Sequence, residues 1–177
     1  MRPTVHTIVI GIDPGASGGI AVLYLFGKFH TDSVVTLPIP DSDLQICSFL
    51  RTLQEQKEKD TIPEIVAWIE KVHAMPQQGV TSSFNFGVNY GKLLMALAAF
   101  QIPYQMVTPQ AWQKRLQIPS RNTQLETKLD FKNRLRLEAQ RRFPNLAIWQ
   151  GTKGSQLAVA DALLIASYGV TERSAHG

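Results

Sequence analysis

The amino-acid sequence predicts one α/β domain over residues 1–177, built on a mixed five-stranded sheet with helices on both faces. Three apolar segments near the N-terminus are separated by short turns, which indicates a hairpin meander. Helical and strand patterns then alternate, which is typical of strands joined by covering helices. The first segment, "TIVIGID", is apolar at successive positions, as in a strand that is buried on both sides.

The five predicted strands are short apolar runs bounded by turn residues. The Gly-rich turn "PGASGG" joins the first two as a hairpin, and two prolines end the third. The fourth ends near Glu70. The predicted strands cover residues 7–13, 18–26, 32–40, 64–72 and 102–108.

Helices are predicted where apolar residues recur at helical spacing between the strands. The first helix follows capping-type Asp and Ser residues, and Leu44, Cys47 (or Ser48) and Leu50 recur in it at helical spacing. Pro109 suits the first turn of a short helix. The predicted helices cover residues 41–59, 81–100, 109–116, 125–143 and 157–170.

Positive charge is concentrated in one part of the chain. The formal net charge is +4, and residues 114–142 hold nine Lys and Arg residues against three acids. A basic segment on a nearly neutral body favours a polyanionic partner, nucleic acid first. A solvated helix face explains the same pattern equally well.

Cysteine content and hydropathy exclude two classes of protein. The single Cys47 rules out an internal disulfide and fits a reducing compartment. No apolar run approaches the length of a membrane span, so we expect no membrane partner. The apolar residues near the N-terminus lead into a Gly-Pro turn and favour a strand over a signal peptide.

Three acids lie in apolar surroundings: Asp13 ends the first strand, Glu70 ends the fourth, and Asp161 lies inside an apolar helix. Buried carboxylates are rare unless they are paired or bind a metal. Each acid also has a simple structural explanation, as a turn cap, a strand-end charge or a partner for nearby backbone. If the first and fourth strands are neighbours, however, the three carboxylates converge. Such a cluster suits Mg²⁺, and paired ions of this kind drive phosphodiester hydrolysis.

Four segments resemble the RuvC-type Holliday junction resolvases, especially their compact phage and bacterial branch: "IGIDPGASGGIAVL", "WIEKVHAMPQQGVTSSFNFGVNYGKL", "PYQMVTPQAWQKRL" and "ADALLIASYG". The similarity spans about residues 8 to 170. It implies an RNase H-like fold and a homodimer with two active sites. It also implies nicking of two opposed strands at a four-way DNA junction, with two Mg²⁺ ions per active site and Mn²⁺ as a substitute. The expected location is the cytosol of a bacterium or a phage-infected cell, with an organelle left open.

The resemblance also assigns roles to individual residues. It implies that Asp13, Glu70 and Asp161 are the catalytic and metal-binding acids, and that Lys114 acts near the scissile phosphate. Phe84 and Phe86 are most simply core residues, although they could stack at a dimer or DNA interface. The expected nucleic-acid-binding residues are His73, Lys114, Arg115, Arg121, Lys128 and Lys132.

Position 158 departs from the family pattern. The resemblance implies a fourth catalytic acid three or four residues before Asp161, where this chain has Ala158 and Leu157. At that spacing two acids share one face of a helix and can share a metal. The site could work with three acids and a helper such as Gln156 or His73. Alternatively, the protein binds junctions with little or no cleavage, or position 158 carries an inactivating substitution.

Three other functions compete with this interpretation. Actin-like sugar kinases and ATPases also begin with a strand, an acid and a Gly-rich hairpin, but they need two such domains and a longer chain. A non-catalytic DNA-binding module of the same fold is consistent with Ala158. A nuclease of this fold could also act on an RNA–DNA hybrid or a flap.

Overall fold

A five-stranded mixed sheet forms the centre of the computed structural model, which describes residues 5–15, 17–26, 30–71 and 79–176. The strand order is β3-β2-β1-β4-β5. The first three strands pair antiparallel as a meander, whereas β4 runs parallel to β1 and β5 runs parallel to β4. The predicted fold class is therefore confirmed. The strands are β1 (Val5–Ile12), β2 (Gly19–Phe26), β3 (His30–Pro38), β4 (Glu64–Glu70) and β5 (Tyr104–Val107).

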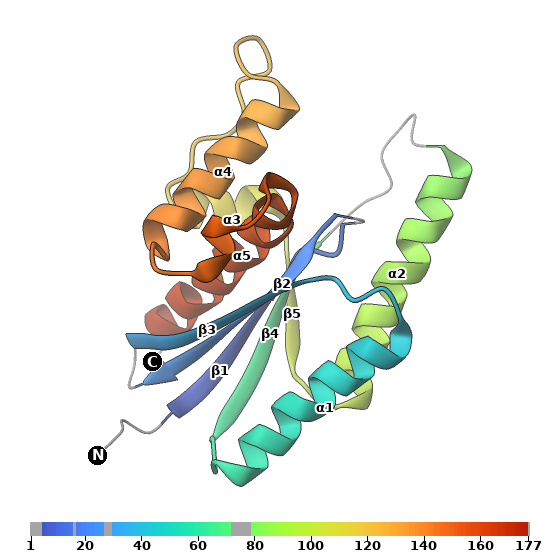
Figure 1. The fold of residues 1–177 in the computed structure, drawn as a ribbon, viewed down its shortest axis with the longest axis vertical. Coiled ribbons are helices and arrows are strands. Elements are labelled where there is room, and N and C mark those ends of the chain that lie inside the picture. The colour runs from blue at the N-terminus through green and yellow to red at the C-terminus, as the bar shows by residue number, and fades with distance from the viewer. Residues whose placement is uncertain (1–4, 16, 27–29, 72–78, 177) are drawn as a thin grey trace.

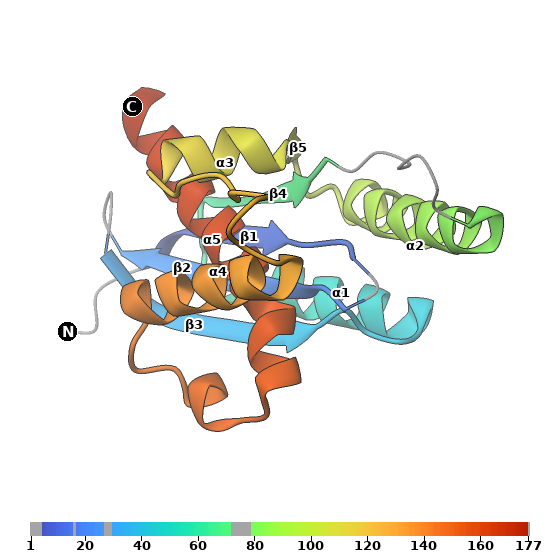
Figure 2. The same ribbon diagram turned by 90° about the horizontal axis from the view of Figure 1, so that it is seen from above.

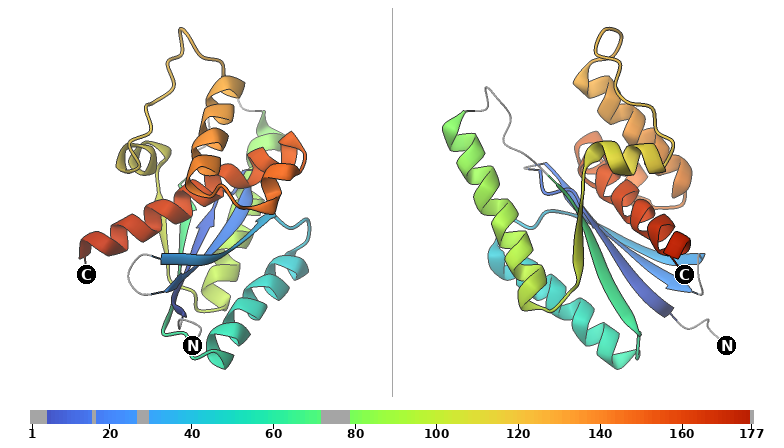
Figure 3. Two further views of the ribbon diagram at one scale, coloured as in Figure 1. Left: turned by 60° about the vertical axis from the view of Figure 1, so that its left-hand side comes forward. Right: turned by 180° about the vertical axis from the view of Figure 1, so that it is seen from behind.

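Helices cover both faces of this sheet (Figure 1). One face carries α1 (Asp43–Lys59) and α2 (Val80–Ala99). The other carries α3 (Pro109–Arg115), α4 (Lys128–Arg142) and α5 (Lys153–His176), and the view from behind in Figure 3 separates the two layers. A short 3-10 turn, η1 (Ala147–Gln150), precedes α5. Within the described part of the chain, no helix is both long and apolar enough to cross a membrane.

Each face of the sheet has its own hydrophobic core. Ile8, Ile10 and Ile12 of β1 pack toward α1 and α2. Val9 faces the opposite way, toward the core formed with α3, α4 and α5. Successive strand residues point to opposite faces, so a strand buried on both sides is apolar at every position. This explains the continuous apolar run that marked β1 in the sequence.

Helix α1 packs on the sheet through one face. Ser42 caps its N-terminus in a capping box with Gln45, and the buried residues are Ile46, Leu50 and Leu53. Leu44, which starts the apolar spacing that predicted this helix, is 82% exposed. Two residues correspond to about 200° around a helix, which turns Leu44 away when Ile46 faces the sheet.

Helix α5 lies directly against β1 and β2 because two glycines leave room for its backbone. A Cβ atom on Gly11 would overlap the carbonyl oxygen of Ala162, and one on Gly19 would overlap that of Ala158. Both glycines therefore permit a close approach that no other residue allows. The approach fixes the height at which α5 crosses the carboxyl end of β1.

We predict that Gly11→Ala destabilises the protein, because the added methyl group must push α5 away from β1. Overpacking of this kind costs about 1–3 kcal/mol. Urea unfolding followed by circular dichroism measures the change. Gly154→Ala is the control, because its Cβ atom meets nothing closer than the Thr152 hydroxyl at 3.9 Å. A Gly11→Ala variant as stable as the Gly154→Ala variant would contradict the close approach.

Candidate active site

Asp13 and Glu70 lie side by side because they end neighbouring parallel strands. Ile12 of β1 pairs with Ile69 of β4, so the next residue of each strand stands at the same level. Both isoleucines belong to the core under α1 and α2. Alternation therefore sends Asp13 and Glu70 to the opposite face, on strands about 4.8 Å apart. That face is the one covered by α3, α4 and α5.

Helix α5 brings the third predicted acid to the same place. Asp161 precedes Ala162, whose carbonyl lies against Gly11 two residues before Asp13. Asp161 is 4% exposed and Asp13 is 7% exposed. The view from above in Figure 2 shows α5 crossing the sheet beneath α4. Close packing on Gly11 thus places a buried carboxylate beside the end of β1.

Lys132 of α4 bridges two of these acids. Its ammonium group donates a hydrogen bond to Asp161 Oδ2 and lies 3.9 Å from Asp13 Oδ2. Burial alone would lower the pKa of Lys132, but the carboxylates of Asp161 and Asp13 outweigh it and raise that pKa above its usual value. A capping box between Thr127 and Asp130 fixes the start of α4 one turn earlier. The sequence did not predict this bridge.

Glu70 is held by a tryptophan that sequence reasoning missed. The indole Nε1 of Trp112, in α3, donates a 2.9 Å hydrogen bond to Glu70 Oε2. Burial, with the Asp13 carboxylate second, raises the pKa of Glu70 to about 7. The available signal was Trp112 itself, a large aromatic residue in the otherwise polar helix "PQAWQKR".

The donor set fits a hard divalent cation. Burial raises the pKa of Asp161, and its Oδ1 atom is buried without a hydrogen-bond partner among the described residues. Carboxylate oxygens are the ligands that Mg²⁺ and Mn²⁺ prefer. In the described part of the chain, no three His, Cys, Asp or Glu side chains converge tightly enough to hold a metal as they stand. Instead, the Lys132 ammonium lies against two of the acids.

The raised pKa of Glu70 predicts how stability depends on pH. Folded Glu70 keeps its proton to about pH 7, whereas the unfolded chain loses it near 4.5. The folded state therefore binds more protons between these values, and in EDTA its stability falls as the pH rises across them. Mg²⁺ competes with that proton, so it should raise the melting temperature more at about pH 8 than at about pH 5.5.

Differential scanning fluorimetry measures both effects. Glu70→Gln is the matched control, because it keeps a neutral side chain of the same length beside Trp112 and should flatten the pH dependence. An unchanged dependence in this variant would assign the effect to other groups.

The remaining predicted basic residues differ in their relation to the acids. Lys128 is exposed one turn before Lys132 and shares its helix face. Lys114 is exposed in α3 about 200° around the helix from Trp112, and its catalytic role stays a prediction. Arg115 pairs with Glu172 of α5 at 2.8 Å, roughly 16 Å along that helix from Asp161. Arg121 is half-buried between α3 and α4.

Two helper residues considered for the missing fourth acid have separate outcomes. The Gln156 amide donates to the backbone oxygens of Trp149 and Gly151 and accepts from Arg136. Its groups are thus engaged in holding the turn before α5, so the helper role is not supported. His73 lies outside the described residues. Ala158 is buried beside Gly19 on α5, one turn before Asp161.

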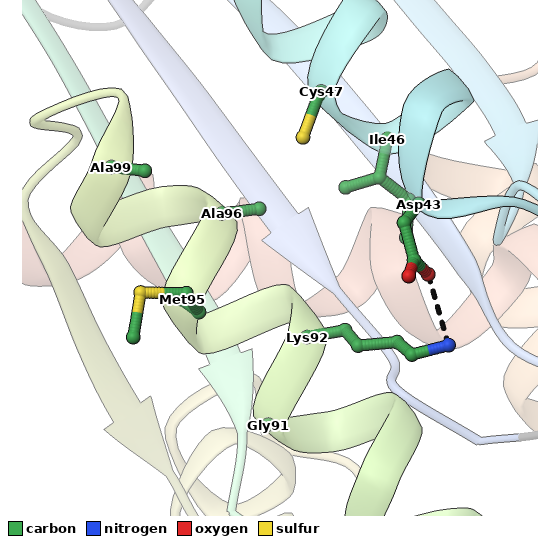
Figure 4. Close-up of a pocket in the computed structure, with 8 residues that line it drawn as sticks. All are labelled: Asp43, Ile46, Cys47, Gly91, Lys92, Met95, Ala96 and Ala99. Carbon is green, nitrogen blue, oxygen red and sulfur yellow. Dashed lines mark ion pairs between the residues drawn. The ribbon is translucent and has the colours of Figure 1, made fainter.

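A groove of about 390 Å³ lies on the other face of the sheet, between α1 and α2. Figure 4 shows Asp43, Ile46 and Cys47 on the α1 side and Lys92 and Met95 on α2. An ion pair of 2.9 Å between Lys92 and Asp43 spans it. None of the three acids lines this groove, so it is separate from the candidate active site.

Helix α2 beside this groove exposes apolar side chains. Phe84 is 69% exposed, so its simplest interpretation as a core residue is wrong. Phe86 is half-buried and stacks on Tyr90 at 6.3 Å between ring centroids. Val80, Phe84, Val88 and Met95 are all exposed at helical spacing and form one stripe, called the α2 stripe below.

Comparison with known proteins identifies the fold. No protein-family model matches the sequence, and no curated protein matches it. Thermus thermophilus RuvC in complex with a Holliday junction substrate aligns with a TM-score of 0.56 at 18% identity, over 94% of this chain and 96% of that one. A second Thermus thermophilus RuvC structure aligns with a TM-score of 0.51 at 18% identity, over 93% and 96% of the two chains.

A further solved structure is more distant. The yeast mitochondrial Holliday junction resolvase Ydc2 aligns with a TM-score of 0.44 at 13% identity, over 98% of this chain and 82% of that one. The two RuvC structures suffice to show that this chain has the RuvC-type, RNase H-like fold expected from its sequence.

Proposed function

We propose that this protein is a divalent-metal-dependent endonuclease that binds four-way DNA junctions and resolves them by paired nicks. The observation that carries the proposal is the meeting of Asp13, Asp161 and the Lys132 ammonium beside Glu70. Two buried aspartates beside a half-buried glutamate are costly unless a cation joins them. The fold is that of a RuvC whose structure holds a Holliday junction substrate, which supports DNA junctions as the target.

The chain's own residues would orient the reaction. Asp13, Glu70 and Asp161 would hold Mg²⁺, with Mn²⁺ as a substitute. A bound divalent cation lowers the pKa of water and stabilises the leaving oxygen of a phosphodiester. Trp112 keeps the Glu70 carboxylate in place through its indole N–H. The Lys132 ammonium, beside both aspartates, attracts the scissile phosphate and offsets its negative charge.

A homodimer would place two such sites on one junction. A two-fold enzyme matches a four-way junction of near two-fold symmetry, so each site would cut one of two opposed strands. The exposed α2 stripe supports a second copy of this chain as the occupant, since exposed apolar side chains that gather on one helix face mark interaction surfaces. We propose that the α2 stripes of two copies pack against each other.

We predict that Phe84→Glu converts the dimer into monomers. A central aromatic residue typically contributes 2 kcal/mol or more to an interface, so the dissociation constant should rise by about thirtyfold or more. Analytical ultracentrifugation measures it. The control is Leu137→Glu, which places the same charge at an exposed leucine of α4 on the opposite face of the sheet. A Phe84→Glu protein that dimerises like the control would contradict this interface.

A second candidate function follows from position 158. Ala158 leaves one acid where the resolvase pattern has two, which favours a protein that binds junctions with weak or no cleavage. Both candidates predict junction-selective binding, and only the first predicts metal-dependent nicks.

Binding selectivity tests what the two candidates share. A labelled four-way junction and a linear duplex of the same sequence are compared in EDTA by gel shift, at a stated salt concentration. We expect the junction to bind at least tenfold more tightly than the duplex, and Lys128→Met to weaken both because it removes a phosphate contact. Equal affinity for the two DNAs would overturn the proposed substrate.

A further inference from the structure

The position of the Lys132 ammonium has a consequence for metal stoichiometry. It contacts Asp161 Oδ2 and lies 3.9 Å from Asp13 Oδ2, so a fixed positive charge already sits between two of the three acids. Leu135 and Ala139, one and two turns later, are buried against α5 and hold α4 in place. Lys132 is therefore delivered to the acids by a packed helix.

Protein donors already contact one oxygen of each of the three carboxylates. Asp161 gives Oδ2 to Lys132 and keeps Oδ1 buried and without a partner among the described residues. Asp13 Oδ1 accepts a 3.1 Å hydrogen bond from the Gly15 amide. Glu70 gives Oε2 to Trp112. Each of the three carboxylates therefore has one oxygen engaged by a protein donor and one left for a cation, and three such oxygens can hold a single Mg²⁺, which keeps several of its waters.

The net charge of the three acids and Lys132 also indicates one cation per active site. Once a metal ion has displaced the proton of Glu70, three carboxylates and one ammonium leave two negative charges, which a single divalent ion neutralises. A second divalent ion would leave an excess of positive charge at a partly buried site, because Ala158 contributes no fourth carboxylate. The expectation of two ions per active site, drawn from the resemblance, does not fit this charge balance.

We infer that each protomer binds one divalent cation, with Lys132 taking the place that a second cation and an acid at position 158 would otherwise occupy. Asp13, Glu70 and Asp161 would hold that single ion. The inference rests on the proposed function for the identity of the metal as Mg²⁺ or Mn²⁺. On this inference, the Lys132 ammonium supplies the positive charge that a second cation would supply, so the site needs no fourth acid at position 158.

Mn²⁺ titration of the metal-free protein without DNA tests this inference, with free Mn²⁺ counted by its electron paramagnetic resonance signal. We expect one bound ion per protomer in the natural sequence. Lys132→Met should bind its first ion at least about tenfold more tightly, because a positive charge beside the site is lost. Lys132→Met combined with Ala158→Asp should bind two ions. Lys59→Met removes a lysine from α1 on the opposite face of the sheet and should change nothing.

The outcomes separate this inference from the proposed function. Two ions in the natural sequence, or a Lys132→Met affinity equal to that of Lys59→Met, would overturn the inference while leaving a metal-dependent nuclease intact. No bound Mn²⁺ in a folded natural protein would overturn the inference and the metal dependence together, while junction binding in EDTA would stay an independent result. If Lys132→Met melts early, Lys132→Gln removes the same charge and keeps a donor for Asp161.

Discussion

Asp161→Asn is expected to abolish metal-dependent junction cleavage while leaving junction binding in EDTA nearly unchanged. Asp161 is buried, pairs with Lys132 and keeps Oδ1 for a cation. Asparagine has the same shape and cannot supply the negative charge. A metal ion contributes several kcal/mol to stabilising the transition state, so its loss should slow cleavage by roughly 10³-fold or more.

The controls for this variant separate chemistry from folding. Glu55→Gln removes an exposed acid from α1, on the opposite face of the sheet, and should cleave at the unchanged rate. Single-turnover cleavage of a labelled junction measures the cleavage rates of the unsubstituted protein and of the two variants. Gel shift in EDTA measures their binding to the junction. An Asp161→Asn protein that cleaves like Glu55→Gln would show that the acids at this end of the sheet are not the active site.

Ala158→Asp is expected to raise Mg²⁺-dependent cleavage by about tenfold or more. The new carboxylate lies one turn before Asp161 on the same helix face, where it can reach the same cation. An added metal contact that is worth about 1.4 kcal/mol in the transition state gives a tenfold gain. The same variant should melt earlier in EDTA, because Ala158 is only 8% exposed and a fourth acid there adds repulsion.

Ala158→Asn is the matched control for this gain. It has the size and polarity of the aspartate side chain without its charge, so it should leave cleavage unchanged. Mg²⁺ should restore the melting temperature of Ala158→Asp more than that of Ala158→Asn. Equal cleavage by both variants would contradict the view that position 158 limits the activity of this site.

The fold and the three acids were open to prediction because strong local patterns specify them. Continuous apolar runs identified β1 and β4, and their parallel pairing then placed Asp13 beside Glu70. An acid in an apolar helix identified Asp161. These predictions rest on burial, which the order of apolar and charged residues along the chain indicates directly.

Contacts between distant elements were not open to prediction in the same way. The sequence predicted Lys132 as a nucleic-acid contact, and only the packing of α4 on α5 identifies it as the partner of Asp161. The sequence indicates only that Trp112 is a core residue. Its hydrogen bond to Glu70 depends on the position of α3 beside β4. Phe84 was assigned to the core by its apolar character, although the orientation of α2 exposes it.

The measurement that tests the central claim most directly is strand-by-strand mapping of nicks in a four-way junction, in Mg²⁺ and in EDTA, with linear duplex alongside. The account predicts nicks at symmetry-related positions of two opposed strands, in Mg²⁺ only, and none in the duplex or with Asp161→Asn. Mg²⁺-dependent cutting of duplex and junction alike, or cutting that persists in EDTA, would contradict it.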